Sequence, residues 1–219
     1  WADQKAIREI MVFLQSHGVG TSRAVRIYKT YGADAIPLVS ENPYRLARDI
    51  KGIGFKTADL VAEKLGIEKT AMIRARAGIS YTLTEAISDG NCALPEADLL
   101  PAAEKLLEIP TDILRDALQQ ELQDETVIAD TIEDQRCIFL SHLWHSEKVI
   151  AGRVKELAIG KPHWPEIDAD KAISWVEQKI GISLADSQHE AVKKAAVSKV
   201  MVITGGPGVG KTTLVNSIL

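Results

Sequence analysis

A glycine-rich stretch has the residue types and spacing needed to bind a nucleoside triphosphate. Gly205 and Gly210-Lys211-Thr212 fit the pattern G-x-x-x-x-G-K-[ST]. The preceding run, Val200–Thr204, is short and β-branched, which predicts a buried strand, and a helical pattern follows the loop. The sequence therefore predicts a strand, a phosphate-binding loop and a helix, in that order.

Each residue type in this loop has a chemical task. The glycines let backbone N–H groups wrap the β-phosphate of ATP. Lys211 is expected to bridge β- and γ-phosphate oxygens, and the Thr212 hydroxyl to bind Mg²⁺, so these two are the candidate catalytic residues. The candidate nucleotide-binding residues of the loop are Gly205, Gly206, Pro207, Gly208, Val209, Gly210, Lys211, Thr212 and Thr213.

A second chemical pattern is a repeat near the other end of the chain. The segment from Gly18 to Gly32 aligns without gaps with the segment from Gly52 to Gly66, at an offset of 34 residues. In each copy an amphipathic stretch precedes a Gly-hydrophobic-Gly turn, and a helical pattern with a small residue (Ala24, Ala58) follows. The pattern predicts two pairs of helices, each joined by a tight turn that needs glycine for its positive φ.

Such a turn leaves backbone N–H groups exposed at the start of a helix, where a phosphate oxygen binds readily. The repeat resembles the helix-hairpin-helix family, whose tandem modules contact nucleic-acid backbone and fix position without reading sequence. The alternative is a pair of helical hairpins with no ligand. The candidate DNA-binding residues are Gly18, Gly20, Thr21, Arg23, Lys51, Gly52, Gly54, Lys56 and Thr57.

The charge of the chain is unevenly distributed. The formal net charge of −4 argues against a nucleic-acid-binding protein when it is taken as a bulk number. Residues 1–80, however, hold 13 Lys and Arg against 8 Asp and Glu, whereas residues 81–219 hold 13 against 22. The first third of the chain is therefore expected to face a polyanion.

The middle of the chain predicts three helices and a β-hairpin. The helices are expected at 71–88, from Pro95 to about Leu107, and from Pro110 to about Leu122 with Thr111 as N-cap. Alternating residues then predict two strands joined by Glu133-Asp134. This is the order of a winged-helix unit, but the acidic second and third helices favour a helical spacer that makes no DNA contact.

Other classes of site are poorly supported. His142 and His145 lack a third ligand at a recognisable spacing and fit a long amphipathic helix from Ser141 to Leu157. Two cysteines without a C-x-x-C pattern, no signal peptide and no apolar run of membrane-spanning length predict a cytoplasmic protein with no membrane partner. The ends, without an initial Met and inside a helical pattern, indicate a piece of a longer chain.

Upstream of the loop, Leu184-Ala-Asp-Ser-Gln188-His-Glu-Ala-Val192 resembles the Q motif of superfamily 1 helicases. With the repeats, the spacer and GGPGVGKTT in this order, the chain resembles the RecD-like (RecD/TraA-type) ATP-dependent DNA helicases; the segment DIKGIGFKTADLVAEKLGI is particularly similar. Val209 stands where that family often has Thr. The resemblance implies that Gln188 binds the adenine edge, that the cofactors are ATP and Mg²⁺, that the partner is DNA, and that unwinding runs 5′→3′.

The expected fold class is mainly α, in three parts. A tandem helix-hairpin-helix domain is expected at 1–69, a helical or winged-helix-like spacer at 70–160, and a linker with the truncated start of a RecA-like α/β P-loop domain at 161–219. The family's water-orienting acidic pair, arginine finger and second motor domain lie beyond Thr213, so these 219 residues alone are expected not to hydrolyse ATP. Two alternatives are a non-enzymatic DNA-binding module of a repair or recombination protein and a RecA/RadA-type recombinase; the Q-like segment and the long spacer favour the helicase.

Overall fold

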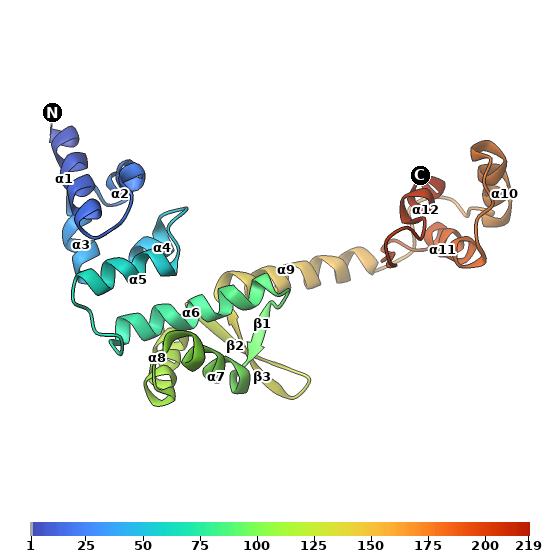
Figure 1. Cartoon of the computed structure of the whole chain (residues 1–219). Helices are drawn as coiled ribbons and strands as arrows, with labels where there is room; N and C mark the ends of the chain where they lie inside the picture. Colours follow the sequence, from blue (N-terminus) through green and yellow to red (C-terminus); the bar gives the residue numbers. More distant parts are fainter. Residues whose placement is uncertain (1) are drawn as a thin grey trace. The chain divides into compact units, whose positions relative to one another are not determined.

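The structure, a computed structural model, describes residues 2–219 and divides into two compact units, 1–145 and 146–219. It is mainly helical with one small sheet, as the sequence predicted (Figure 1). The finer division at 69/70 and 160/161 stays a prediction. No helix within residues 2–219 combines the length and the apolar character that crossing a bilayer requires.

Both copies of the repeat form a helix, a glycine turn and a second helix. In the first copy a short 3₁₀ turn intervenes before the second helix, and a further 3₁₀ turn and helix lead to the second copy. The first copy and its linker are α1 (Ala2–Ser16), η1 (Thr21–Arg23), α2 (Ala24–Tyr31), η2 (Gly32–Asp34) and α3 (Ala35–Glu41); the second copy is α4 (Arg45–Asp49) and α5 (Phe55–Lys64).

The two copies share one hydrophobic core. The middle residue of each turn, Val19 and Ile53, is buried in it, which holds each turn against the helices. Ala24 is completely buried in this core, and Ala58 is completely buried in the neighbouring core that α5 forms with α6 and the winged-helix unit, so both small side chains allow close helix packing. The other buried members of the shared core are Ile10, Leu14, Ile27, Ala35, Val39, Leu46, Ile50 and Val61.

The middle of the chain has the winged-helix order of elements that the sequence indicated, with one strand more than predicted. A three-residue strand that the sequence analysis missed pairs with the last strand, giving an antiparallel sheet of order β1-β3-β2. Glu133 and Asp134 both have positive φ, as a two-residue hairpin turn requires. The elements are α6 (Met72–Ser88), β1 (Ala93–Pro95), α7 (Glu96–Leu107), α8 (Thr111–Gln123), β2 (Val127–Ile132) and β3 (Gln135–Leu140).

The predicted capping role of Thr111 is wrong. Pro110 is the N-cap of α8, and no side chain caps it. The Thr111 hydroxyl instead donates a hydrogen bond of 2.5 Å to Glu104 on α7, because Thr111 is already the first residue of the helix.

A buried guanidinium joins the repeats to the winged-helix unit. Arg74 on α6 is 9% exposed and donates from Nε and Nη2 to both carboxylate oxygens of Asp59 on α5, at 2.9 and 3.1 Å. Its Nη1 donates to the carbonyl of Leu107 at the end of α7, and the Tyr44 hydroxyl donates to the same Asp59. Burial acts against the charged guanidinium, but the bonds and charge of Asp59 outweigh it and raise the pKa of Arg74.

The second unit is small. It comprises the later part of α9 (Ser141–Ala158), α10 (Ala169–Ile180), α11 (Asp186–Val197) and α12 (Lys211–Ile218), with Ile173, Leu184, Val192 and Leu214 as its buried core.

The predicted strand at Val200–Thr204 does not form among the described residues, and Val202 is 81% exposed. A parallel core strand needs neighbouring strands for its backbone hydrogen bonds, and the described part of the chain offers it none.

The Arg74 contact generates a stability prediction. Arg74→Met leaves the Asp59 carboxylate partly buried without its cation, so the free energy of unfolding is expected to fall by about 2–3 kcal/mol, less than for a fully buried pair because Asp59 keeps some exposure. Urea unfolding of the 219-residue chain measures it. Arg48→Met is the control: Arg48 is 67% exposed beside Asp49, and its loss is expected to cost less than about 1 kcal/mol. Equal effects of the two substitutions would contradict the role given to Arg74.

Candidate functional site

The first glycine turn is closed by local hydrogen bonds. Gly18 has φ +77°, and the N–H of Val19 returns to the carbonyl of Leu14 at 2.8 Å. His17 Nδ1 lies 2.7 Å from the carbonyl of Phe13, one turn back on α1. Gly20 is extended, and Thr21 and Arg23 lie in the 3₁₀ turn rather than in an α-helical first turn. The candidate DNA contacts of this repeat therefore precede the α-helix proper.

The second turn leads directly into its helix. Gly52 has φ +90°, Gly54 is the extended N-cap, and α5 begins at the next residue. The N–H groups of Thr57 and Ala58 both bond to the carbonyl of Gly54, so the donors ahead of them stand at the open end of the helix. Lys51 and Lys56, on either side of the glycines, are exposed. The structure thus brings together the candidate residues of the second repeat at one helix start.

Sequence reasoning missed one member of this second site. Arg26, on α2 of the first repeat, donates from Nη1 to the carbonyl of Lys51 at 2.8 Å. No spacing rule links residues 25 positions apart, so only the packing of the two repeats reveals the contact.

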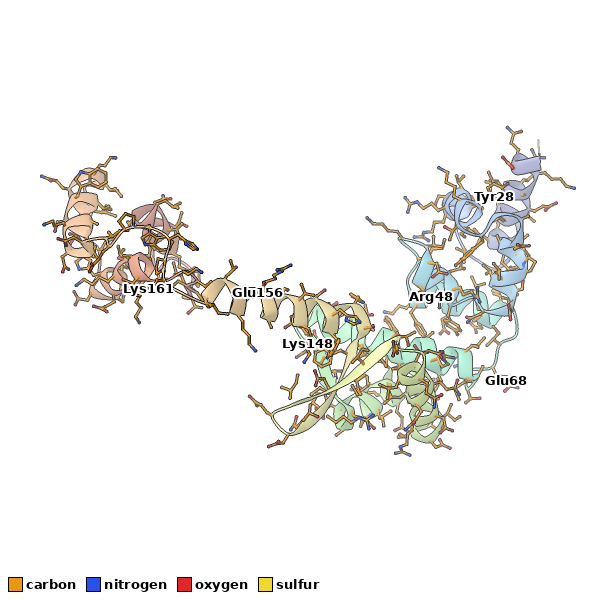
Figure 2. All side chains as sticks on the ribbon, turned by 180° about the vertical axis from the view of Figure 1, so that it is seen from behind. Tyr28, Arg48, Glu68, Lys148, Glu156 and Lys161 are labelled. Atoms are coloured by element: carbon orange, nitrogen blue, oxygen red, sulfur yellow. The ribbon has the colours of Figure 1, made fainter. Side chains whose placement is uncertain are left out.

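Tyr28 and Arg48, labelled in Figure 2, lie on α2 and α4 of the two repeats. The Tyr28 hydroxyl donates to Asp3 on α1 at 2.6 Å, which fixes α2 against α1, and this hydrogen bond raises the pKa of Tyr28. The Arg48 guanidinium pairs with the adjacent Asp49. Aromatic and ionic contacts thus support the helices that carry the turns.

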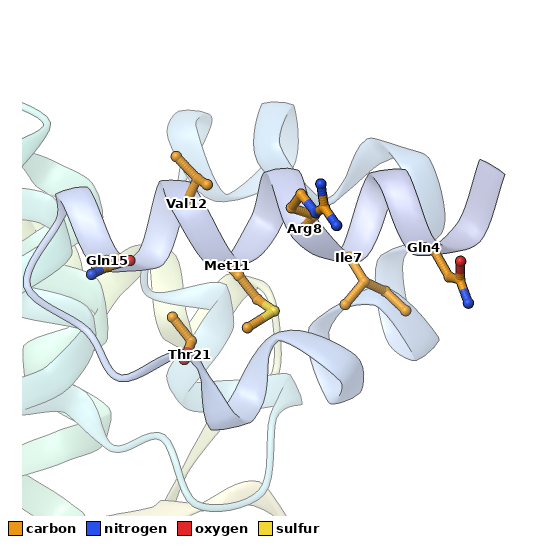
Figure 3. Close-up of a pocket in the computed structure, with 7 residues that line it drawn as sticks. All are labelled: Gln4, Ile7, Arg8, Met11, Val12, Gln15 and Thr21. Atoms are coloured by element: carbon orange, nitrogen blue, oxygen red, sulfur yellow. The ribbon is translucent and has the colours of Figure 1, made fainter. Parts of the chain in front are cut away.

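A pocket of about 490 Å³ lies along α1 beside the first turn (Figure 3). Its lining mixes apolar and polar side chains, and Thr21 contributes from the turn at one end. Of the candidate DNA contacts, Thr21 alone lines it. The lining residues are Gln4, Ile7, Arg8, Met11, Val12, Gln15 and Thr21.

The phosphate-binding loop has the backbone its sequence predicts. Gly208 and Gly210 have φ of +79° and +77°, values that suit glycine, and α12 begins at Lys211. The Lys211 ammonium donates to the carbonyls of Gly205 and Gly206 at 2.6 and 2.5 Å, so this side chain extends back to the beginning of the glycine-rich loop. Thr212 follows as the second helical residue and is exposed.

The loop residues fit a phosphate group. A Cβ at Gly205 would lie 2.8 Å from Val209 Cγ2, and Gly210 has a φ of +77° that favours glycine, so the backbone of the loop folds closely on itself. The start of α12 supplies backbone donors, and Lys211 supplies a positive charge beside them. Mg·ATP bound there would supply the phosphoanhydride bond to be broken; the chain's residues would hold its phosphates and its metal ion.

Gln188 lies beside the loop. Its Oε1 accepts a hydrogen bond from the Ala185 N–H at 2.9 Å, which caps α11, while its Nε2 lies next to Gly210. Sequence reasoning missed Glu177 on α10, which accepts from the Leu184 N–H at 2.7 Å and lies 3.0 Å from His189 Nε2. The bonds from His189 and Leu184 lower the pKa of Glu177. Glu177 thereby fixes the start of the helix that carries Gln188.

The remaining sequence pattern, His142 and His145, lies on α9, where the sequence predicted a long helix. Among residues 2–219 no three His, Cys, Asp or Glu side chains are grouped so that they could hold a metal ion.

Comparison with known proteins gives matches at both ends of the chain. Residues 3–93 match the family model for the HHH domain of the ATP-dependent RecD2 DNA helicase, and residues 188–219 match an AAA domain model. The ATP-dependent RecD2 DNA helicase of Deinococcus radiodurans is 25% identical over 229 aligned residues, which cover all of this chain and 31% of that protein. The RecBCD enzyme subunit RecD of Buchnera aphidicola is 29% identical over 96 residues, 44% of this chain and 15% of that protein.

The fold and the family models define a helix-hairpin-helix domain, followed by a winged-helix unit and by a segment that matches an AAA domain. Within that class the chain is similar to RecD-like helicases from end to end, and the resemblance expected from the sequence is confirmed. The chain spans less than a third of the length of these relatives.

The two glycines of the second turn predict different responses to a methyl group. Gly52→Ala puts a Cβ on a residue with φ +90° and is expected to lower the free energy of unfolding by about 1–2 kcal/mol. At Gly54 the φ is −99° and a Cβ would meet no other atom. Alanine is a poorer N-cap than glycine, but it also lowers the conformational entropy of the unfolded chain, and the two effects oppose each other. The free energy of unfolding of Gly54→Ala is therefore expected to change by less than about 0.5 kcal/mol. Chemical unfolding of both variants measures the difference, and a larger cost at Gly54 would contradict the turn geometry.

Proposed function

We propose that this chain is the DNA-gripping and ATP-binding part of a DNA helicase that unwinds 5′→3′. The observation that carries the proposal is the combination, in one chain similar to RecD-like helicases, of two glycine turns and a phosphate-binding loop. The direction of unwinding and a role in repair or recombination rest on the family resemblance. The cytoplasmic location expected from the sequence remains part of the proposal.

The hairpins would hold DNA through its phosphates. The second turn offers N–H donors at the start of α5 with Lys51 and Lys56 beside them, and the first offers Gly18, Gly20, Thr21 and Arg23. Backbone donors and cations bind phosphate oxygens whatever the base, so the grip would be independent of sequence and sensitive to salt.

The loop would hold ATP. Backbone N–H groups of the loop would surround the β-phosphate, and Lys211 would leave the carbonyls of Gly205 and Gly206 to pair with β- and γ-phosphate oxygens. Thr212 would bind Mg²⁺, and Gln188, already beside Gly210, would reach the adenine edge. The amide that meets adenine is then held by α11, whose start Glu177 fixes.

DNA binding through the second turn predicts a charge-dependent loss. The double variant Lys51→Glu/Lys56→Glu is expected to bind a DNA oligonucleotide at least about tenfold more weakly at low salt, with a log–log salt slope shallower by about two. Fluorescence anisotropy between 50 and 200 mM salt, a range that resolves such slopes, would measure both quantities.

The matched control is Lys29→Glu/Lys64→Glu, which makes the same charge change at the exposed far ends of α2 and α5. Unchanged affinity in the Lys51/Lys56 variant would reduce the turns to a structural role. Equal losses in both double variants would assign the binding to net charge rather than to the turns.

If the loop binds ATP, removal of the Lys211 ammonium should lower the affinity of the chain for the nucleotide. Lys211→Ala removes the cation at the loop and is expected to weaken binding of a fluorescent Mg·ATP analogue by about tenfold or more, whereas Lys194→Ala, on exposed α11 surface, leaves it unchanged.

The 219-residue chain itself is expected to show no DNA-stimulated ATP turnover. Steady turnover by this chain would contradict that expectation, and equal binding by the two variants would contradict the role of Lys211.

A further inference from the structure

One side chain crosses from the first repeat to the turn of the second. Arg26 is the third residue of α2 and is exposed, yet its Nη1 donates to the Lys51 carbonyl at 2.8 Å. A Cβ built on Gly52 would lie 3.6 Å from the same nitrogen, so the guanidinium lies against the Lys51–Gly52 peptide.

The contact has no counterpart in the other direction. At the offset of 34 residues the position equivalent to Arg26 is Leu60, which is 51% exposed and has no donor. The first turn is held instead by its own α1, through the bonds of His17 and Val19. The two repeats, equivalent in sequence pattern, therefore differ in what stands beside their turns.

Arg26 adds a cation to a site that already has two. Lys51 and Lys56 flank the same glycines, and within the described residues none of these three side chains has a carboxylate within 4 Å. A guanidinium carries five N–H donors in a planar fork, and the bond to the Lys51 carbonyl uses one edge of it. Within the described residues its other donors make no hydrogen bond, so they stay available to an anion beside the Lys51–Gly52 peptide.

We propose that Arg26 is a DNA-phosphate-binding residue of the second hairpin, supplied by the first repeat and held in place by the Lys51 carbonyl. The inference rests on the proposed DNA-binding function. The second hairpin is then a site with three cations, Arg26, Lys51 and Lys56, to which both repeats contribute. It is expected to bind DNA phosphates more tightly than the first hairpin does.

The test compares Arg26→Gln with Arg26→Lys in DNA binding as salt is varied. Arg26→Gln is expected to weaken binding to a DNA oligonucleotide by about fivefold at low salt and to make the log–log salt slope shallower by about one, because one phosphate contact is lost. Arg26→Lys keeps the charge and is expected to keep the slope. Lys29→Gln, one turn further along α2, is the control and is expected to change neither quantity.

The outcomes separate the two proposals. If the plot of log affinity against log salt concentration has the same slope for Arg26→Gln as for the wild type, whatever the affinity, then Arg26 has only a structural role and the inference is overturned. If the Lys51→Glu/Lys56→Glu variant also binds like the wild type, the proposed DNA-binding role of the turn fails as well. If the Lys51→Glu/Lys56→Glu variant loses DNA affinity while Arg26→Gln keeps the wild-type salt slope, the inference about Arg26 is overturned and the proposed DNA-binding role of the turn stands. Arg26→Lys, which keeps the donor to Lys51, provides the comparison if the glutamine variant folds poorly.

Discussion

The arrangement of the first unit depends on a charge that is taken out of water. Arg74 is buried where α5, α6 and the end of α7 meet, and a buried guanidinium is tolerated only if its donors are satisfied. Asp59 satisfies it from the second repeat and the Leu107 carbonyl from the winged-helix unit. Meeting both partners at once fixes α5 against α6, and α5 begins at the glycine turn that carries the candidate phosphate site. The buried contact between Arg74 and Asp59 therefore helps to position the exposed second glycine turn, because both lie on or beside α5.

Close packing supports the same junction on the same face of α6, because Gly78 lies one helical turn after Arg74. A Cβ at Gly78 would clash with the buried Leu107 side chain, so α6 and the end of α7 approach each other closely at this glycine. The two faces of α5 also serve different cores: Val61 is buried with the repeats, while Phe55 and Ala58 are buried with α6 and the winged-helix unit. The helix that starts at the second turn is thus held from both sides.

Local patterns predicted much of this. Glycine at matched positions predicted both turns, and Gly18 and Gly52 have the positive φ that the pattern requires. The loop from Gly205 and the start of α12 at Lys211 also follow from a local motif. What failed depends on partners distant in sequence. The strand β1 exists because β3 lies beside it. The strand expected at Val200–Thr204 is missing because no strand among residues 2–219 pairs with it, and Arg26 meets Lys51 only through the packing of two repeats.

The tip of the β2–β3 hairpin has an electrostatic consequence. Its two turn residues, Glu133 and Asp134, are both acidic and exposed. An acidic hairpin tip of this kind repels a polyanion, whereas the exposed Lys51 and Lys56 of the second glycine turn attract one. If the glycine turns bind DNA as proposed, this difference in charge favours the approach of DNA to the turns over its approach to the hairpin tip.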